Sequence, residues 1–181
     1  MQFQTFGPVA FQPSTERQNR WRSAFWEEMS TYCGKYDLNN ELQNCIGCYA
    51  FGMQTKQSLK IWYVGQTLAK DGFRSEIFQT HKVNHYTRVA AERCGQPVMF
   101  LFPLMTQAGK FSKDRSSSAD TIDWLERTLI AMSLKKNPEL ANVKETRFQR
   151  GIWVYGLLGE QPAGRPFPER KAVRQAFGLE K

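Results

Sequence analysis

Apolar positions along the chain follow two different patterns, which separate predicted helices from predicted strands. Helices are predicted at about residues 14–32, 72–93 and 120–136. Short runs rich in β-branched and aromatic side chains predict strands at about residues 46–53, 59–65 and 97–104. Because helices and strands are interleaved, the pattern predicts an α/β fold.

The first and last predicted helices each carry one apolar stripe that would face a core. The stripe consists of Trp21, Phe25, Met29 and Tyr32 in the first helix, and of Ile122, Leu125, Leu129 and Met132 in the last. Ser14 or Thr15 is the expected N-cap of the first helix, and Asp120 is that of the last. Asn137 followed by Pro138 is expected to end the last helix.

The first two predicted strands are separated by a short polar link, so we expect them to form an antiparallel hairpin. The third, residues 97–104, is a continuous apolar run typical of a strand covered on both faces. If the hairpin turn is centred on Lys56, Tyr49 lies directly opposite Tyr63, and both side chains point to one side of the sheet. Two interpretations stay open: two phenols at a functional site, or an aromatic pair that only stabilises the sheet.

The two ends of the chain fall outside this pattern. We expect an irregular arm at residues 1–13, a short strand or buried segment at 151–158, and a Pro- and Gly-rich linker at 159–168 before a small terminal helix. The chain is therefore divided into an N-terminal arm and helix packed on the core (1–45), a main domain (46–158), and a basic linker and tail (159–181).

The composition favours a polyanionic partner. The 181 residues carry a formal net charge of +8, and Lys and Arg side chains release counterions from phosphates when they bind nucleic acid. From Lys135 onward, ten Lys or Arg residues stand against five Asp or Glu, although such a segment also suits a solvated face. No apolar run reaches the roughly 20 residues of a membrane span. The first residues lack a secretory signal, so we expect a cytoplasmic protein that does not bind a membrane.

Three side chains lie where the predicted helices would let them carry chemistry. Arg74 lies just inside the second predicted helix, where a guanidinium and the helix dipole both favour a phosphate. His81 follows two turns later and would share the same stripe. Glu126 borders the apolar stripe of the last helix, where a carboxylate costs free energy unless it is paired or binds a metal. The alternatives are a surface arginine, a histidine at the core edge and a glutamate whose head group reaches solvent.

The cysteines leave a metal site open as an alternative. Cys45 and Cys48 form a Cys-x-x-Cys pair, which would bind zinc only with a second pair of ligands. Cys33 and Cys94 do not supply that pair at close spacing. Free thiols in a reducing cytosol are the simpler interpretation.

Taken together, these residues resemble the GIY-YIG endonuclease family over about residues 46–144. The matching segments, in order, are Gly47-Cys48-Tyr49, Tyr63-Val64-Gly65, Arg74, Leu125-Glu126-Arg127 and Asn142. The resemblance implies a small sheet of three antiparallel strands flanked by helices. The segment at residues 66–73 is longer than in the family, so either Arg74 or no residue is the equivalent of the family's arginine.

The resemblance also implies a reaction: metal-dependent hydrolysis of a phosphodiester bond in nucleic acid, with DNA favoured over RNA. One Mg²⁺ or Mn²⁺ ion would be held by Glu126 and waters. Tyr49 would activate the attacking water, Tyr63 would hydrogen-bond the phosphate or the water, and Arg74 would neutralise developing charge. His81 is a further candidate catalytic residue, and the site would be supported by Gly47, Gly65 and Asn142.

Two alternatives to an endonuclease stay open. The first is a catalytically weak or inactive GIY-YIG-like module that binds nucleic acid or a partner protein, an interpretation motivated by the longer segment after Gly65. The second is a structural or metal-binding protein organised by its cysteines. The sequence pattern leaves the target sequence, the pathway and the oligomeric state open.

Overall fold

A five-stranded antiparallel sheet forms the centre of the computed structural model, which describes residues 2–14, 18–34, 41–142, 172–173 and 175–176. The chain groups into two compact units, residues 1–141 and residues 142–181. All helices and strands named below belong to the first unit.

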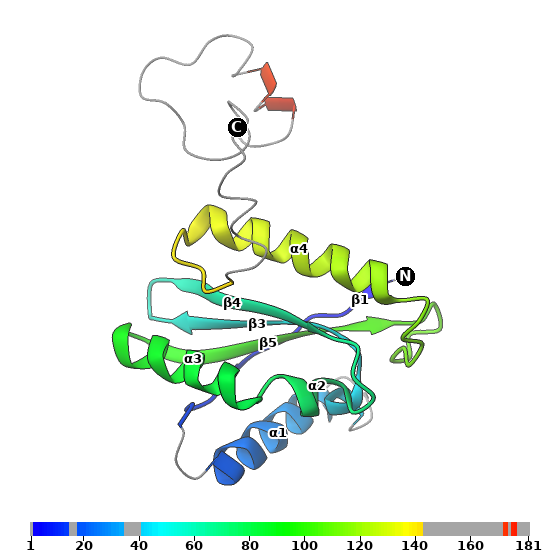
Figure 1. The fold of residues 1–181 in the computed structure, drawn as a ribbon, viewed down its shortest axis with the longest axis horizontal. Coiled ribbons are helices and arrows are strands. Elements are labelled where there is room, and N and C mark those ends of the chain that lie inside the picture. Colours follow the sequence, from blue (N-terminus) through cyan, green and yellow to red (C-terminus); the bar gives the residue numbers. More distant parts are fainter. Residues whose placement is uncertain (1, 15–17, 35–40, 143–171, 174, 177–181) are drawn as a thin grey trace. The chain divides into compact units, whose positions relative to one another are not determined.

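The strands of the sheet are β1 (Gln2–Phe3), β2 (Phe6–Ala10), β3 (Gly47–Gln54), β4 (Leu59–Thr67) and β5 (Gln96–Met105). Their order is β1-β5-β3-β4, and β2 also pairs with β5. The helices are α1 (Gln18–Gly34), α2 (Gly72–Glu76), α3 (Thr80–Glu92) and α4 (Ala119–Lys136), and a short 3-10 helix spans Leu42–Asn44. Figure 1 shows α4 on one face of the sheet and α1, α2 and α3 on the other.

The predicted α/β class and hairpin are confirmed, but the expectation of a three-stranded sheet is wrong. The three expected strands are present as β3, β4 and β5. The N-terminal arm, expected to be irregular, supplies β1 and β2, which both pair with β5. Phe6 and Val9 point into the core from this arm, while Pro8 between them is exposed. A proline suits an edge strand because it cannot donate a ladder hydrogen bond, so the sequence signal for β2 was weak.

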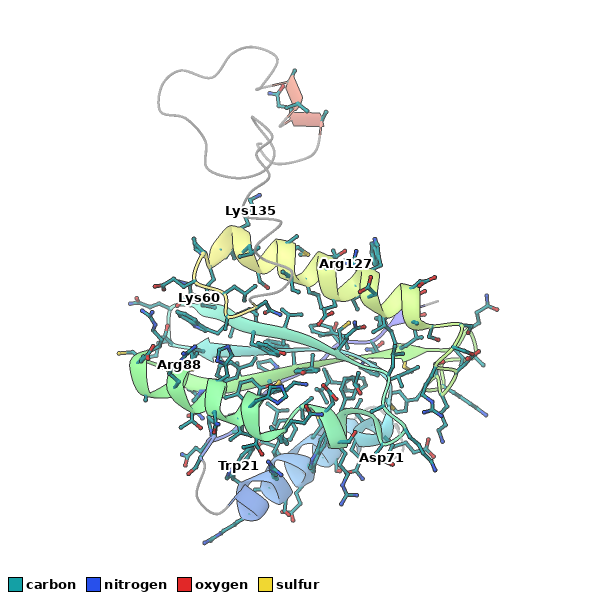
Figure 2. All side chains as sticks on the ribbon, in the orientation of Figure 1. Trp21, Lys60, Asp71, Arg88, Arg127 and Lys135 are labelled. Atoms are coloured by element: carbon teal, nitrogen blue, oxygen red, sulfur yellow. The ribbon has the colours of Figure 1, made fainter. Side chains whose placement is uncertain are left out.

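Alternate residues of β3 face two different core layers, as the two-residue period of a strand requires. Tyr49 and Phe51 belong to the large cluster that includes side chains of α1, α2 and α3. Cys48 packs with Ile122 of α4, and Ala50 packs in the neighbouring cluster with a later turn of the same helix. Figure 2 shows side chains filling both layers.

The single helix expected over residues 72–93 is two helices, α2 and α3. The chain leaves the helical conformation before Gln79, whose φ of −60° and ψ of 146° are extended. Phe78 packs edge-on against Trp21 of α1 with ring centroids 4.8 Å apart, and the Arg22 side chain donates a hydrogen bond to the Phe78 carbonyl. The break is therefore stabilised by contacts with α1. The local spacing of apolar residues gives no sign of such contacts between distant segments.

The outer helices follow their predicted stripes in part, and the side chain of Tyr32 in the first stripe lies outside the described ones. Phe25 and Met29 of α1 are buried, as is Ile122 of α4. The prediction that Met132 faces the core is wrong, because its side chain is 64% exposed while Ile130 is buried. The stripe of α4 that faces the sheet is thus rotated from the predicted one toward residues 122, 126 and 130.

The predicted segments at residues 151–158 and 159–168, and the domain boundary between them, lie outside the described residues. In the predicted terminal helix, residues 172, 173, 175 and 176 are described and are helical. Among the described helices, none has the length and apolar character needed to cross a membrane.

Candidate active site

Tyr49 and Tyr63, the two predicted catalytic phenols, lie side by side in the layer between the sheet and helices α1 to α3. Their ring centroids are 6.1 Å apart, and the ring planes are tilted by 36°. Tyr49 is fully buried, whereas Tyr63 is half-buried. Each phenol comes from one strand of the hairpin, so the pairing of β3 with β4 brings them together.

The two tyrosines are diagonal neighbours rather than the direct partners that a turn centred on Lys56 would give. Tyr49 pairs with Gly65, and Tyr63 pairs with Phe51. Between Phe51 and the hairpin turn, an irregularity directly after Phe51 changes the pairing register. A displacement of two residues keeps both side chains on one face, because side chains alternate along a strand. The predicted proximity of the phenols therefore holds although the predicted register is wrong.

The two predicted supporting glycines make room for neighbouring groups. The Tyr49 ring crosses over Gly65, where a Cβ atom would lie 2.4 Å from both Cζ and the hydroxyl oxygen of the phenol. Gly47 has a φ of +152°, and a Cβ atom there would lie 2.2 Å from the Phe102 carbonyl oxygen. Neither position accepts a side chain unless its neighbours move.

Helix α3 adds three side chains to the phenol pair, and none of them was a predicted site residue. The Lys82 ammonium lies 5.3 Å from the centre of the Tyr49 ring. The rings of His85 and Tyr86 lie 5.9 Å and 6.0 Å from the ring of Tyr63. We call Tyr49, Tyr63 and Tyr86 the tyrosine cluster.

The tyrosine cluster stays protonated near neutral pH. Burial raises the pKa of Tyr49 and that of Tyr86 well above the ordinary value of 10.0. Tyr63 and the Glu76 carboxylate raise both further, whereas the Tyr49 hydroxyl lowers the pKa of Tyr86. Burial also raises the pKa of Tyr63, although the nearby Tyr49 hydroxyl lowers it. The hydroxyls of Tyr49 and Tyr86 are buried, and neither has a partner at normal hydrogen-bond geometry among the described residues. The hydroxyls nevertheless lie close enough to one another for Tyr49 to lower the pKa of Tyr63 and of Tyr86.

Lys82 and Glu76 form a largely buried ion pair next to the tyrosine cluster. The Lys82 side chain is 6% exposed and the Glu76 side chain 23% exposed. The ammonium donates to the Glu76 carboxylate and, at 3.2 Å, to the Glu76 main-chain carbonyl oxygen. The Gln79 side-chain amide donates to the second carboxylate oxygen at 3.0 Å. Glu76 thus holds the lysine with two oxygen atoms and remains partly open to solvent.

The His85 ring links α3 to the segment that follows α4. Its Nδ1 atom lies 3.2 Å from a guanidinium nitrogen of Arg88, and its Nε2 atom lies 3.4 Å from the Ala141 carbonyl oxygen. A guanidinium only donates and a carbonyl only accepts. The arrangement therefore fits a neutral imidazole that carries its proton on Nε2, with both ring nitrogens occupied.

Arg74 and His81, both predicted catalytic residues, are exposed. Arg74 lies in the last turn of α2, and His81 lies at the start of α3. The prediction that they share one helical stripe is wrong, because the chain is extended at Gln79 between them. Lys82 takes the inward position that His81 was expected to hold. Asn142 is half-buried and is the first residue of the second unit.

Glu126 lies on α4, which covers the other face of the sheet (Figure 1). It is half-buried between Ile122 and Ile130 on the stripe that faces the sheet. Its carboxylate nevertheless lies near enough to Tyr63 to raise the pKa of that phenol. Glu126 and the phenols therefore lie on opposite faces of the sheet, of which β4 is the last strand on this side.

The two cysteines of the Cys-x-x-Cys pair face different partners. The Cys45 thiol donates to the Glu41 carbonyl at 3.2 Å, and the Cys48 thiol donates to the Ile122 carbonyl at 3.3 Å. Burial raises the pKa of Cys48, and nearby carboxylates, Glu126 first, raise it further. A metal binds the thiolate rather than the thiol. Within the described part of the chain, no three His, Cys, Asp or Glu side chains gather where they could hold a metal ion.

One signal in the sequence could have identified the α3 residues. Lys82, Tyr86 and Val89 recur at helical spacing, and all three are buried. A lysine in an apolar stripe is as uncommon as a glutamate there, so the criterion that selected Glu126 would also have selected Lys82. Glu76 carries no such signal because it lies on the other side of the helix break.

The phenol pair and the lysine held by a carboxylate thus lie on one face of the sheet, and Glu126 lies on the other. The resemblance to the GIY-YIG family depends on the motif residues and their placement. Comparisons of the chain with protein-family models, with curated proteins and with solved structures found no match.

Proposed function

We propose that this protein is a divalent-metal-dependent endonuclease that hydrolyses phosphodiester bonds in nucleic acid, with DNA favoured over RNA. The observation that carries the proposal is the placement of Tyr49 and Tyr63, with ring centroids 6.1 Å apart, beside the Lys82 ammonium, which lies 5.3 Å from the centre of the Tyr49 ring. The resemblance to the GIY-YIG family and the net charge of +8 support it.

Glu126 is the residue that would hold Mg²⁺ or Mn²⁺ in this proposal. A single half-buried carboxylate near the sheet edge suits a small hard cation, because such an ion keeps several waters and takes further oxygen ligands from a phosphate. When bound, the ion would polarise the scissile phosphate and stabilise the leaving oxygen. The family resemblance matches Glu126 rather than Asp123, which lies one turn earlier on α4 and pairs with Arg127 at 3.0 Å.

The tyrosine cluster would contribute hydrogen bonds to the reacting phosphate. Because burial raises the pKa of Tyr49, its hydroxyl enters the reaction protonated and would first act as a donor to a phosphate oxygen or to the attacking water. It becomes a general base only after positive charge approaches and lowers that pKa. Tyr63, half-buried at the edge strand, would contact the same phosphate, and Arg74 and His81 would contact flanking phosphates from the surface.

The test is plasmid nicking by Glu126→Ala with Mg²⁺ or Mn²⁺ present. We expect nicking to be lost while the circular dichroism spectrum and melting temperature stay close to those of the wild type, because the side chain is only half-buried. Asp123→Ala is the matched control, a carboxylate removed from the same helix that should leave nicking intact. Wild-type nicking by Glu126→Ala would rule out the proposed role of this residue.

A nucleic-acid-binding module without cleavage is the second candidate, and one observation favours it. Tyr49 is fully buried, and Glu126 lies over the other face of the sheet; cleavage requires a substrate to reach both groups, whereas binding does not. Salt-dependent DNA binding in EDTA, with no nicking by the wild type in any divalent cation, would select this candidate.

A further inference from the structure

Lys82 is an unusual residue to find inside an aromatic layer. The whole residue is 5% exposed, and lysines are almost never this buried unless they are paired. A buried ion pair gives little net stability compared with apolar side chains of the same size, because both ions lose their hydration. Stability alone therefore does not explain why an ammonium lies above the Tyr49 ring.

The surroundings of Lys82 offer donors to an anion. Tyr49 and Tyr86 each have a buried hydroxyl without a partner at normal geometry among the described residues. A buried hydroxyl that lacks a partner costs free energy, and a ligand oxygen would remove that cost. The Glu76 side chain is 23% exposed, so solvent reaches the ion pair at the carboxylate.

We propose that Lys82 is the positively charged residue that binds the scissile phosphate in this protein, in the role expected of Arg74, and that Glu76 is the positioning residue that holds it. Tyr86 adds a third phenol to the predicted pair. This inference rests on the proposed function, since it assigns a residue to the same site. The recognised chemistry is that of phosphate oxygens, from either a polynucleotide or free phosphate, and the polynucleotide is the ligand that we propose.

If Lys82 binds a phosphate, the charge of Glu76 should affect the affinity for that phosphate, which a purely structural ion pair would not do. The negative charge of Glu76 opposes a bound phosphate, while its two oxygen atoms fix the ammonium. Glu76→Gln keeps the main-chain oxygen and a side-chain oxygen that can accept from Lys82, but it removes the charge. We therefore expect Glu76→Gln to bind a phosphate group more tightly than the wild type.

The experiment measures binding of a fluorescein-labelled DNA duplex in EDTA, where no metal-dependent cleavage can occur. We expect Lys82→Met to weaken binding about tenfold. It should also reduce by about one the slope of the logarithm of the binding constant against the logarithm of the salt concentration. Lys82→Arg should restore most of the affinity, Tyr86→Phe should weaken it severalfold, and Glu76→Gln should strengthen it severalfold. Lys70→Met, which removes an exposed lysine, is the matched control and should have a smaller effect than Lys82→Met.

Two arms of the experiment separate this inference from the proposed function. Inorganic phosphate is added as competitor and as the sole ligand in thermal-shift measurements. Lys82-dependent binding of phosphate without binding of DNA would overturn the polynucleotide as the ligand. Lys82-dependent DNA binding by a wild type that never nicks would support Lys82 as the residue that binds a backbone phosphate and would reject the nuclease.

The assignment of Lys82 itself is overturned by any of three results. One is a wild type that binds neither DNA nor phosphate. Another is Lys82→Met with wild-type affinity, a result that leaves only a structural ion pair. Since Lys82→Met could fail to fold, the third result comes from the milder variants. It is the finding that Glu76→Gln and Tyr86→Phe both fold normally and both bind DNA with wild-type affinity.

Discussion

Replacement of Gly65 by alanine tests the packing that positions the first phenol. The added Cβ atom would lie 2.4 Å from Cζ and from the hydroxyl oxygen of Tyr49. Carbon atoms in contact normally lie about 3.5–4.0 Å apart, so the ring has to move by about 1 Å. Tyr49 is fully buried, and Phe73 stands edge-on to its ring with centroids 6.5 Å apart, so the ring has little free space to enter.

The expected magnitude follows from that displacement. Overpacking in a core costs about 1–3 kcal/mol, which corresponds to a fall in melting temperature of roughly 2–12 °C for a chain of this size. If Tyr49 acts on the phosphate, a misplacement of about 1 Å reduces the nicking rate by about 100-fold. Gly65→Ala should therefore damage function far more than stability.

The assay combines urea unfolding with plasmid nicking, and Gly34→Ala is the control. A Cβ atom added at Gly34 would meet no other atom within 4 Å, and the residue lies at the end of α1, so its replacement should change stability by at most about 1 kcal/mol. In a Tyr49→Leu background, which lacks Cζ and the hydroxyl, Gly65→Ala should cost less than it does alone. A Gly65→Ala variant with wild-type stability and wild-type nicking would refute this account of the site.

Two further predictions concern stability. Asn137→Ala should lose about 1–3 kcal/mol in urea unfolding, because the fully buried Asn137 amide donates to the Ile61 carbonyl at 2.7 Å; Glu139→Ala, at an exposed ion pair, should lose under about 1 kcal/mol. The second prediction is that the protein loses stability at alkaline pH. Because Tyr49 and Tyr86 have a raised pKa in the folded state, their contribution to the free energy of unfolding is complete below about pH 10, where unfolded tyrosines ionise. That contribution is lost as the pH rises toward the folded pKa values. The urea concentration at the unfolding midpoint should therefore decrease as the pH rises above 10. At pH 10.5, replacing both tyrosines with phenylalanine should leave the absorbance of the folded protein at 295 nm unchanged, because neither phenol is ionised. A loss of phenolate absorbance in that variant would contradict the prediction.

Features that depend on neighbouring residues were predictable from the sequence. The hairpin, the third strand and α4 lie within a few residues of their expected positions, because alternation and helical spacing are local signals. The closeness of Tyr49 and Tyr63 followed from the hairpin, since even a register displaced by two residues keeps them on one face.

Features that depend on distant segments were not predictable in this way. The break at Gln79 is stabilised by aromatic packing on α1, so a continuous helical period placed Arg74 and His81 together by mistake. The partner of Lys82 lies beyond that break, and no local pattern joins the two. The two N-terminal strands likewise form only because β5 offers them an edge.

The arrangement of the sheet edges limits where a substrate can meet both halves of the candidate site. Strands β1 and β2 pair with β5 on the side away from β3, so β4 forms the opposite edge. The carbonyl groups of Ile61 and Trp62 accept hydrogen bonds from the segment after α4, which covers the part of β4 near the hairpin turn. Beyond it, the stretch from Tyr63 to Thr67 runs between the tyrosine cluster on one face and Glu126 on the other. In the proposed function, a phosphodiester that contacts both would approach there, so nicking should depend on this short stretch of edge more than on either face.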